Sequence, residues 1–392
     1  MSTTLRKCIV LGPAGTITPV PSNPQYLAYQ SAPGTYANLI FLLDSQTRWV
    51  KLWVHLPSMW PARNDLRVTL RDQLDYQIAV AKSYGFGVIL GIHHDLPLWI
   101  NGGLRTTDVP LDTSETGNWC QMFSAFASRY SAGNPARPFN GLSQVDIFEF
   151  CNEPNQLWTT NANGNTDIPG TVAILFKRAK KIVTGLKNAP LVAGPSVSDL
   201  DPDILPGDRN YFDFTAKVLE RLAGNGFYDI TPHSVCIWTH HNYTDVTYDQ
   251  GANTTAPDRN EHMVGRPQFD RFHLRSAWAR ALLVNGGWRG WPSGDPSNPR
   301  MFLTEGGAKA QVVIPRWSIT PAQFPAKQSE LVARNLIRLS DDTATGGAGV
   351  DMMANYLQIT VATDDTGMFE PPPSLAARPL YTNTWKPYPG RL

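Results

Sequence analysis

The sequence predicts a single (β/α)8 barrel that takes in the whole chain, residues 1–392. Eight short apolar runs alternate along the chain with segments of helical periodicity. The runs are continuously apolar rather than alternating, which is typical of parallel strands buried on both faces. No linker-like stretch divides the chain, so a closed eight-stranded α/β repeat is favoured.

Each expected strand is rich in aliphatic, β-branched or aromatic residues and stops at Pro, Gly or a polar cluster. In order, the expected strands are residues 7–11 (before Gly-Pro), 49–56 (ended by Pro57), 88–92 (before His-His-Asp), 145–151 (before Asn-Glu-Pro), 191–194, 234–238 (before Thr-His-His-Asn-Tyr), 301–304 (before Glu-Gly-Gly) and 349–354 (before Asn-Tyr).

Each expected helix carries apolar residues three and four positions apart. In order, the expected helices are residues 36–47, 68–84 (stopped by Gly85), 118–130, 171–186 (with seven apolar residues on one face), 211–222, 272–283 and 328–339. The Pro-rich, aromatic segment from about 371 to 392 is expected to pack on the barrel as an extended tail. An open doubly wound sheet is the alternative, but Gly12-Pro13-Ala14-Gly15 does not match its phosphate-binding fingerprint.

Composition excludes several kinds of partner. The 34 basic and 33 acidic residues nearly cancel and no basic block stands out, so neither nucleic acid nor an anionic membrane is expected as a partner. No apolar run reaches the ~20 residues of a transmembrane helix. The N-terminal apolar run is too short for a secretory signal, so a cytoplasmic or a processed secreted protein is expected. The four cysteines, at positions 8, 120, 151 and 236, have no metal-like spacing and are expected to be buried free thiols.

The stretch around Asn152-Glu153-Pro154 is the strongest candidate for a reactive site. An aromatic, apolar strand ends there at a proline, which cannot donate to a ladder. A carboxylate just beyond a strand end is held on a rigid element, as an acid/base catalyst requires. The same tripeptide also fits a helix start, with Asn152 as the cap.

In a (β/α)8 barrel, the residues that follow the strands converge on one mouth. Here they are His55, His93 or His94, Asn152 with Glu153, His241 with Tyr243, Glu305, and Asn355 with Tyr356. Two opposed carboxylates among hydroxyl and imidazole donors are what cleavage of a glycosidic bond needs. Several tryptophans near strand ends, among them Trp53 and Trp158, suit stacking on sugar faces or packing in the core.

The paired motifs Phe148-Glu149-Phe150-Cys151-Asn152-Glu153-Pro154 and Leu303-Thr304-Glu305 resemble the retaining glycoside hydrolases of clan A. His241-Asn242-Tyr243 is similar to the His-x-Tyr of that clan's sixth strand. Ile92-His93-His94 is similar to family 5, whereas Asn155 after Asn-Glu-Pro is more like family 39.

The resemblance implies an acid/base role for Glu153 and a nucleophile role for Glu305. The pKa values of the two carboxyl groups are expected to differ, because the negative charge of Glu305 raises the pKa of Glu153. It implies that Asn152 binds the sugar 2-hydroxyl and that Tyr243 bonds the nucleophile. Lys51 stands where the clan has arginine, and Tyr356 stands near the position of a tryptophan.

The expected substrate is an oligosaccharide, polysaccharide or simple glycoside, with His93, His94, His241, Lys51, Trp53, Trp158 and Tyr356 completing its binding site. Glu149 shares strand parity with Glu153 and is expected to be a buried, paired carboxylate lower in the barrel.

No metal and no cofactor are expected. Adjacent strand residues point to opposite faces, so His93/His94 and His240/His241 should each send one member inward. The chain also lacks His-Glu-x-x-His. A catalytically inactive sugar-binding barrel and a metal-dependent hydrolase are the alternative functions. The sequence specifies neither the sugar, nor its linkage, nor an oligomeric state.

Overall fold

The structure of the chain is a computed structural model. It describes residues 5–14, 45–103, 105–132, 134–136, 138–139, 141–160, 164, 166–187, 189–199, 210–224, 236–248, 275–286, 288, 299, 301–340, 350–356, 368 and 377–389. The helix expected at 36–47 lies almost entirely outside these residues.

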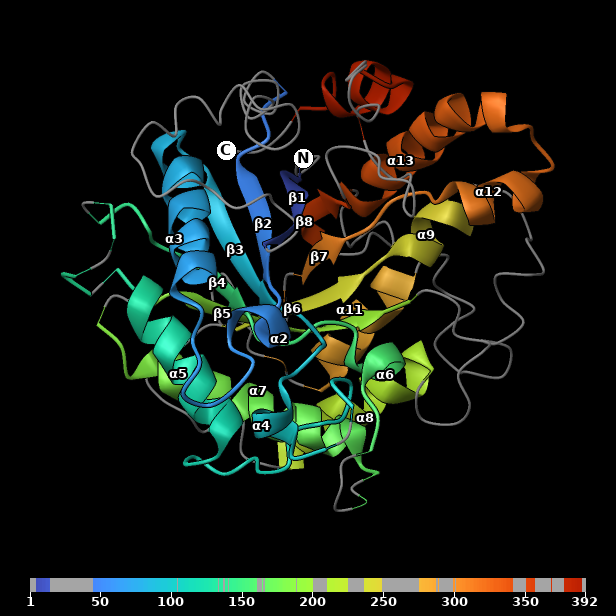
Figure 1. Ribbon diagram of the computed structural model, residues 1–392. Helices are drawn as coiled ribbons and strands as arrows, with labels where there is room; N and C mark the ends of the chain where they lie inside the picture. Colours follow the sequence, from blue (N-terminus) through green and yellow to red (C-terminus); the bar gives the residue numbers. More distant parts are fainter. Residues whose placement is uncertain are drawn as a thin grey trace.

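Eight parallel strands follow one another in chain order, and β8 pairs with β1, so the barrel is closed (Figure 1). The strands are β1 (Arg6–Ala14), β2 (Trp49–Val54), β3 (Gly87–Ile92), β4 (Ile147–Glu149), β5 (Leu191–Ser198), β6 (Cys236–His241), β7 (Met301–Glu305) and β8 (Val350–Asn355). The predicted barrel is confirmed. Strand β4 is shorter than expected, while β5 and β6 extend beyond their expected ends.

Helices surround the strands on the outside of the barrel (Figure 1). They are α2 (Leu56–Met59), α3 (Val68–Ser83), α4 (Leu98–Asn101), α5 (Asn118–Tyr130), α6 (Pro154–Leu157), α7 (Ile168–Thr184), α8 (Tyr211–Gly224), α9 (Tyr243–Tyr248), α11 (Arg275–Asn285), α12 (Ala310–Trp317) and α13 (Phe324–Ser340), with a short 3-10 turn at Pro321–Gln323 and a π-helical turn, η7, at Leu380–Trp385. Within the described residues, no helix has both the length and the apolar character needed to cross a bilayer.

Two separate apolar cores follow from the alternation of strand side chains. The inner core fills the barrel with one or two side chains from every strand: Cys8, Val10, Trp53, Ile89, Ile147, Ala193, Ile237, Phe302, Met352 and Ala354. The outer core lies between strands and helices, where Phe148 of β4 packs edge-on against Phe123 of α5 with ring centroids 5.9 Å apart. All four cysteines are buried and none forms a disulfide, as predicted.

Glycines on β3 make room inside the barrel for large side chains of β2. A Cβ atom on Gly87 would lie 2.5 Å from the Trp49 ring. One on Gly91 would lie 2.6 Å from the Trp53 ring and 3.2 Å from Cε of Lys51. The barrel interior therefore accepts Trp53 and Lys51 side by side because β3 has no side chain at position 91.

The described part of the C-terminal tail packs on the barrel. The π-helical turn η7 lies against α13. Lys7 of β1 donates from Nζ to the carbonyl oxygens of Trp385 and Tyr388, both at 2.7 Å. The Trp385 indole donates to Oγ1 of Thr47 at 2.9 Å. Residues 371–376 at the start of the expected tail lie outside the described residues.

Replacing Gly91 with alanine should destabilise the barrel. The new methyl group would overlap the Trp53 ring, and overpacking of this kind typically costs about 1–3 kcal/mol. We expect a lower melting temperature in thermal unfolding.

Gly185, at the end of α7, provides the matched control. Its φ is −74° and an added Cβ would meet only ordinary contacts at 3.5 Å or more. Gly185→Ala should therefore be neutral or slightly stabilising, because alanine restricts the unfolded chain. Equal melting of the two variants would contradict the close packing at Gly91.

Candidate active site

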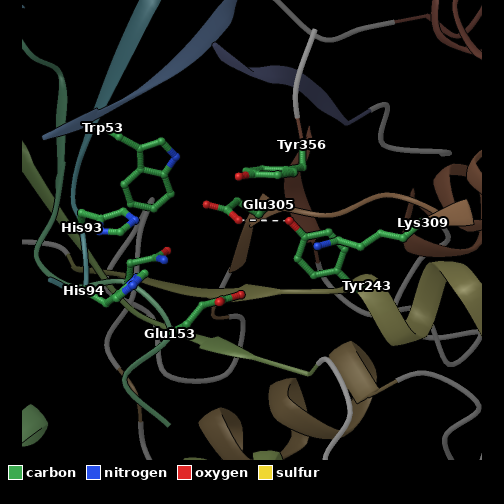
Figure 2. A pocket seen from close by; sticks show the side chains of 9 residues that line it. Trp53, His93, His94, Glu153, Tyr243, Glu305, Lys309 and Tyr356 are labelled. Atoms are coloured by element: carbon green, nitrogen blue, oxygen red, sulfur yellow. Dashed lines mark hydrogen bonds between the residues drawn. The ribbon is translucent and has the colours of Figure 1, made fainter. Parts of the chain in front are cut away.

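A cavity opens at the C-terminal mouth of the barrel (Figure 2). It is lined by Trp53, His93, His94, Asn152, Glu153, Tyr243, Glu305, Lys309 and Tyr356, which come from β2, β7 and the segments that follow β3, β4, β6, β7 and β8. All of the sequence-predicted site residues except Lys51, His241 and Trp158 are in this lining, and Lys309 is an addition.

The two carboxylates predicted to react face each other across the cavity. One carboxylate oxygen of Glu153 and one of Glu305 lie within 4.8 Å of each other, although the residues are far apart in the chain. Carboxyl groups about 5–5.5 Å apart are typical of the double-displacement geometry, whereas the inverting geometry needs about 6.5–9.5 Å. A close approach of the two carboxylates is therefore consistent with the double-displacement geometry.

Glu153 is held by an unusual backbone conformation. Strand β4 ends at Glu149, and Glu153 is the N-cap of the short helix α6, with φ 42° and ψ 47°. Its backbone N–H donates to the carbonyl oxygen of Ser196 on β5 at 3.0 Å, which fixes this left-handed conformation. The predicted strand end and the predicted helix start are therefore both partly correct, but Glu153 is the cap rather than Asn152.

Glu305 ends β7 and is held by three groups. Lys51 Nζ lies 3.2 Å from its Oε1, and the Tyr243 hydroxyl donates to its Oε2 at 3.1 Å, the dashed line in Figure 2. Nδ1 of His241 lies 3.5 Å from the same Oε2. The next residue, Gly306, has no space for a side chain, because a Cβ atom would lie 2.0 Å from Oδ1 of Asn242.

Lys51 lies beneath the cavity and does not line it, so its assignment to the binding site stays a prediction in which it acts through Glu305. The side chain is fully buried, with Nζ 2.5 Å from Glu149 Oε1 and 3.7 Å from the centre of the Trp53 ring. Glu149 is the buried, paired carboxylate that strand parity predicted. One ammonium group therefore compensates two buried carboxylates, those of Glu149 and Glu305.

His241 lies between the carboxylates of Glu153 and Glu305 rather than on the cavity surface. Its Nδ1 is 2.8 Å from Glu153 Oε1, and the ring is fully buried. Burial raises the pKa of Glu153, but the hydrogen bond and charge of His241, with smaller contributions from Ser198 and Lys309, outweigh it and lower that pKa to about 2. The expectation that Glu305 raises the pKa of Glu153 is therefore wrong for the free protein, because His241 is the closer partner.

His93 and His94 both line the cavity, which corrects the expectation that only one would face inward. Strand β3 ends at Ile92, so the alternation of a strand does not apply to them, and their ring centroids lie 3.8 Å apart. His240 and His241 lie within β6 and do alternate, with His240 Nε2 2.9 Å from Ser276 Oγ on the helix side.

Trp158 does not stack on a substrate in this arrangement, and its predicted place in the binding site is corrected. The side chain is buried, and its indole donates to the carbonyl oxygen of His94 at 2.9 Å. It therefore supports the backbone beneath the histidines.

Lys309 is the cavity residue that the sequence analysis missed. It follows Glu305 by four residues, and its Nζ lies 4.5 Å from the ring centre of Tyr243 and 5.6 Å from that of Tyr356. The only signal in the sequence is its position in the segment after β7, since nothing in the residues themselves distinguishes it from a surface lysine.

Fold and site together define a closed (β/α)8-barrel protein with paired carboxylates at its mouth. The chain matches no family model, and no curated protein matches it. Solved structures do resemble it over nearly its whole length.

One is a GH5-4 broad specificity endoglucanase from Clostridium acetobutylicum, 11% identical, with a TM-score of 0.56 and coverage of 97% of this chain and 96% of that one. A GH5 family lichenase from a Caldicellulosiruptor species is 13% identical, with a TM-score of 0.56 and coverage of 98% and 93%. A glycoside hydrolase family 5 enzyme from Prevotella bryantii, in complex with a xyloglucan tetradecasaccharide, is 13% identical, with a TM-score of 0.53 and coverage of 98% and 96%. At this identity the likeness establishes the shared fold.

Removing the ammonium of Lys51 should destabilise the folded chain. Lys51→Met leaves Glu149 and Glu305 buried without their common partner, and breaking a buried pair typically costs roughly 3–5 kcal/mol. Adding Glu149→Gln removes one of the two uncompensated charges and should recover a large part of this loss. Urea unfolding of the single and double variants measures both effects. The exposed Lys181→Met serves as control, and a Lys51→Met chain as stable as the control would contradict the shared ion pair.

The lowered pKa of Glu153 should appear in the pH dependence of stability. In the unfolded chain this group titrates near its ordinary value of about 4.3. The folded chain therefore gains stability from Glu153 above that pH, and loses it as the pH falls toward about 2. The unfolding free energy of the wild type should thus fall more steeply between pH 5 and pH 2.5 than that of Glu153→Gln. The exposed Glu330→Gln should follow the wild type, and parallel curves for wild type and Glu153→Gln would refute the assignment.

Proposed function

We propose that the protein is a retaining glycoside hydrolase that cleaves O-glycosidic bonds by double displacement. The observation that carries the proposal is the approach of the Glu153 and Glu305 carboxylates to within 4.8 Å at the mouth of a (β/α)8 barrel. The endoglucanase, the lichenase and the xyloglucan complex of similar fold support a polysaccharide substrate and make β-glucans and xyloglucan the first candidates.

In the first step, Glu305 attacks the anomeric carbon while the bond to the leaving oxygen breaks. The Lys51 ion pair and the Tyr243 hydrogen bond hold opposite oxygens of the Glu305 carboxylate, which restricts its rotation. A nucleophile held in one orientation loses little entropy on reaction. The product is a glycosyl ester on Glu305 and a leaving group that has accepted a proton.

Glu153 delivers that proton. In the free protein its pKa is lowered to about 2, and Nδ1 of His241 lies 2.8 Å from its Oε1. A bound sugar displaces water from the pocket, and this desolvation raises the pKa of Glu153 because it disfavours the charged form. In the second step Glu153 takes a proton from the water that cleaves the ester, and the cycle closes.

Aromatic and amide groups supply the sugar-binding surface. Trp53 and Tyr356 line the cavity beside Glu305 and offer apolar faces to a sugar ring (Figure 2). Oδ1 of Asn152 is buried and has no hydrogen-bond partner within the described part of the chain, so it is an acceptor for a sugar hydroxyl. His93 and His94 add imidazole groups on the same side as Trp53.

Activity of the wild type and of two variants on aryl β-glycosides, lichenan, cellulose and xyloglucan tests the proposal. Glu305→Ala should lose nearly all turnover, because it removes the nucleophile. Glu153→Ala should retain more activity on aryl glycosides with good leaving groups, which need little protonation. The exposed Glu115→Ala should behave as wild type. Proton NMR of the first sugar released should show net retention at the anomeric carbon.

Inversion in the NMR experiment would overturn the nucleophile role of Glu305. Binding without turnover across the whole panel would instead identify a sugar-binding barrel. A loss of turnover on chelation would identify a metal-dependent hydrolase.

A further inference from the structure

Three side chains converge at one side of the cavity rim: His55 after β2, and His93 and Asp95 after β3. We call them the rim cluster. Nε2 of His55 lies 3.5 Å from Oδ2 of Asp95, and Nδ1 of His93 lies 3.4 Å from the same oxygen. All three atoms lie within 4.8 Å of one another.

These distances match the edges of a metal coordination polyhedron. Ligand atoms about 2.0–2.2 Å from a tetrahedral Zn²⁺ lie roughly 3.3–3.6 Å from one another. The two contacts of Asp95 Oδ2 already fall in that range, so a small movement of the two imidazole rings would complete a three-ligand face. Three protein ligands with a fourth position open to water is the usual form of an accessible zinc site.

The second atom of two of these ligands is already held by another residue. Nδ1 of His55 is 2.7 Å from Oγ of Ser58, and this contact leaves Nε2 directed at Asp95. The hydroxyl of Thr106 donates to Oδ1 of Asp95 at 2.9 Å, which leaves Oδ2 for the two histidines. Outer partners of this kind orient metal ligands and increase the affinity of the site for the metal.

The accessibility of the rim cluster also suits a cation. The side chains of His55, His93 and Asp95 are 31%, 23% and 22% exposed, so an ion in solution can reach them.

We propose that the rim cluster of His55, His93 and Asp95 binds a divalent transition-metal ion such as Zn²⁺, and that the bound ion inhibits turnover by occupying one side of the cavity. Two imidazole nitrogens and one carboxylate oxygen favour Zn²⁺, Cu²⁺, Ni²⁺ or Co²⁺ over Ca²⁺ and Mg²⁺, which need more oxygen ligands. His93 is the link to the cavity, because it belongs to the rim cluster and to the lining.

Glu153, His241 and Glu305 form a second group of three close ligand atoms. The ammonium of Lys51, 3.2 Å from Glu305, opposes a further positive charge there. His241 Nδ1 is also engaged with Glu153 at 2.8 Å. The rim cluster is therefore the favoured site, and this second group is the competing explanation that an experiment must separate.

The test uses the full chain, stripped of metal by a chelator and titrated with ZnCl₂ in a calorimeter without substrate. Co²⁺ absorption in the visible range reports the same site by a second method. One Zn²⁺ should bind per chain. His55→Ala and Asp95→Asn should each weaken binding by at least about tenfold. The matched control Asp72→Asn, which removes an exposed carboxylate on α3, should bind as the wild type does.

Three results would overturn the proposal: no binding to the wild type, wild-type affinity in both rim variants, or loss of binding in Glu153→Gln with retention in His55→Ala. The inhibitory part rests on the proposed function. In the activity assay, added Zn²⁺ should reduce turnover of the wild type and reduce turnover of His55→Ala far less. Because calorimetry needs no turnover, a failure of the metal site and a failure of the proposed function give different results.

Discussion

The site depends on one ammonium group that serves two carboxylates inside the barrel. Lys51 lies 2.5 Å from Glu149 and 3.2 Å from Glu305, and none of the three side chains is more than 5% exposed. Two negative charges and one positive charge in a poorly solvated space are stable only with close, fixed geometry. The missing side chain at Gly91 and the ring of Trp53 maintain that geometry. The packing of the barrel core therefore also determines the orientation of Glu305.

Imidazole groups contact carboxylates at a second level, above this layer. His241 contacts Glu153 and Glu305, whereas His55 and His93 contact Asp95 at the rim. The two groups differ in their surroundings. His241 is fully buried, and the side chains of the rim histidines are partly exposed. The same side chain therefore suits the proposed proton chemistry in one place and the proposed metal binding in the other.

The barrel and the two opposed glutamates could be predicted because they depend on local patterns: apolar runs for strands, and polar residues directly after them. What could not be predicted depends on contacts between distant segments. The direction of the Glu153 pKa shift follows from His241, which is 88 residues away in the chain. The inward position of both His93 and His94 follows from the end of β3 at Ile92, and strand parity alone could not place that end. The sequence also could not predict that Trp158 is buried with its indole bonded to the carbonyl oxygen of His94, because this contact joins two distant segments.

The left-handed backbone at Glu153 places a limit on how stable this protein can become. A non-glycine residue with φ 42° holds strain of about 1–2 kcal/mol, which the rest of the fold must offset. Glycine or asparagine would relieve that strain, yet either would remove the carboxylate. A substitution at position 153 that relieves the strain would therefore also remove the carboxylate on which the proposed function depends. At this one residue, greater stability and the proposed chemistry have opposite requirements.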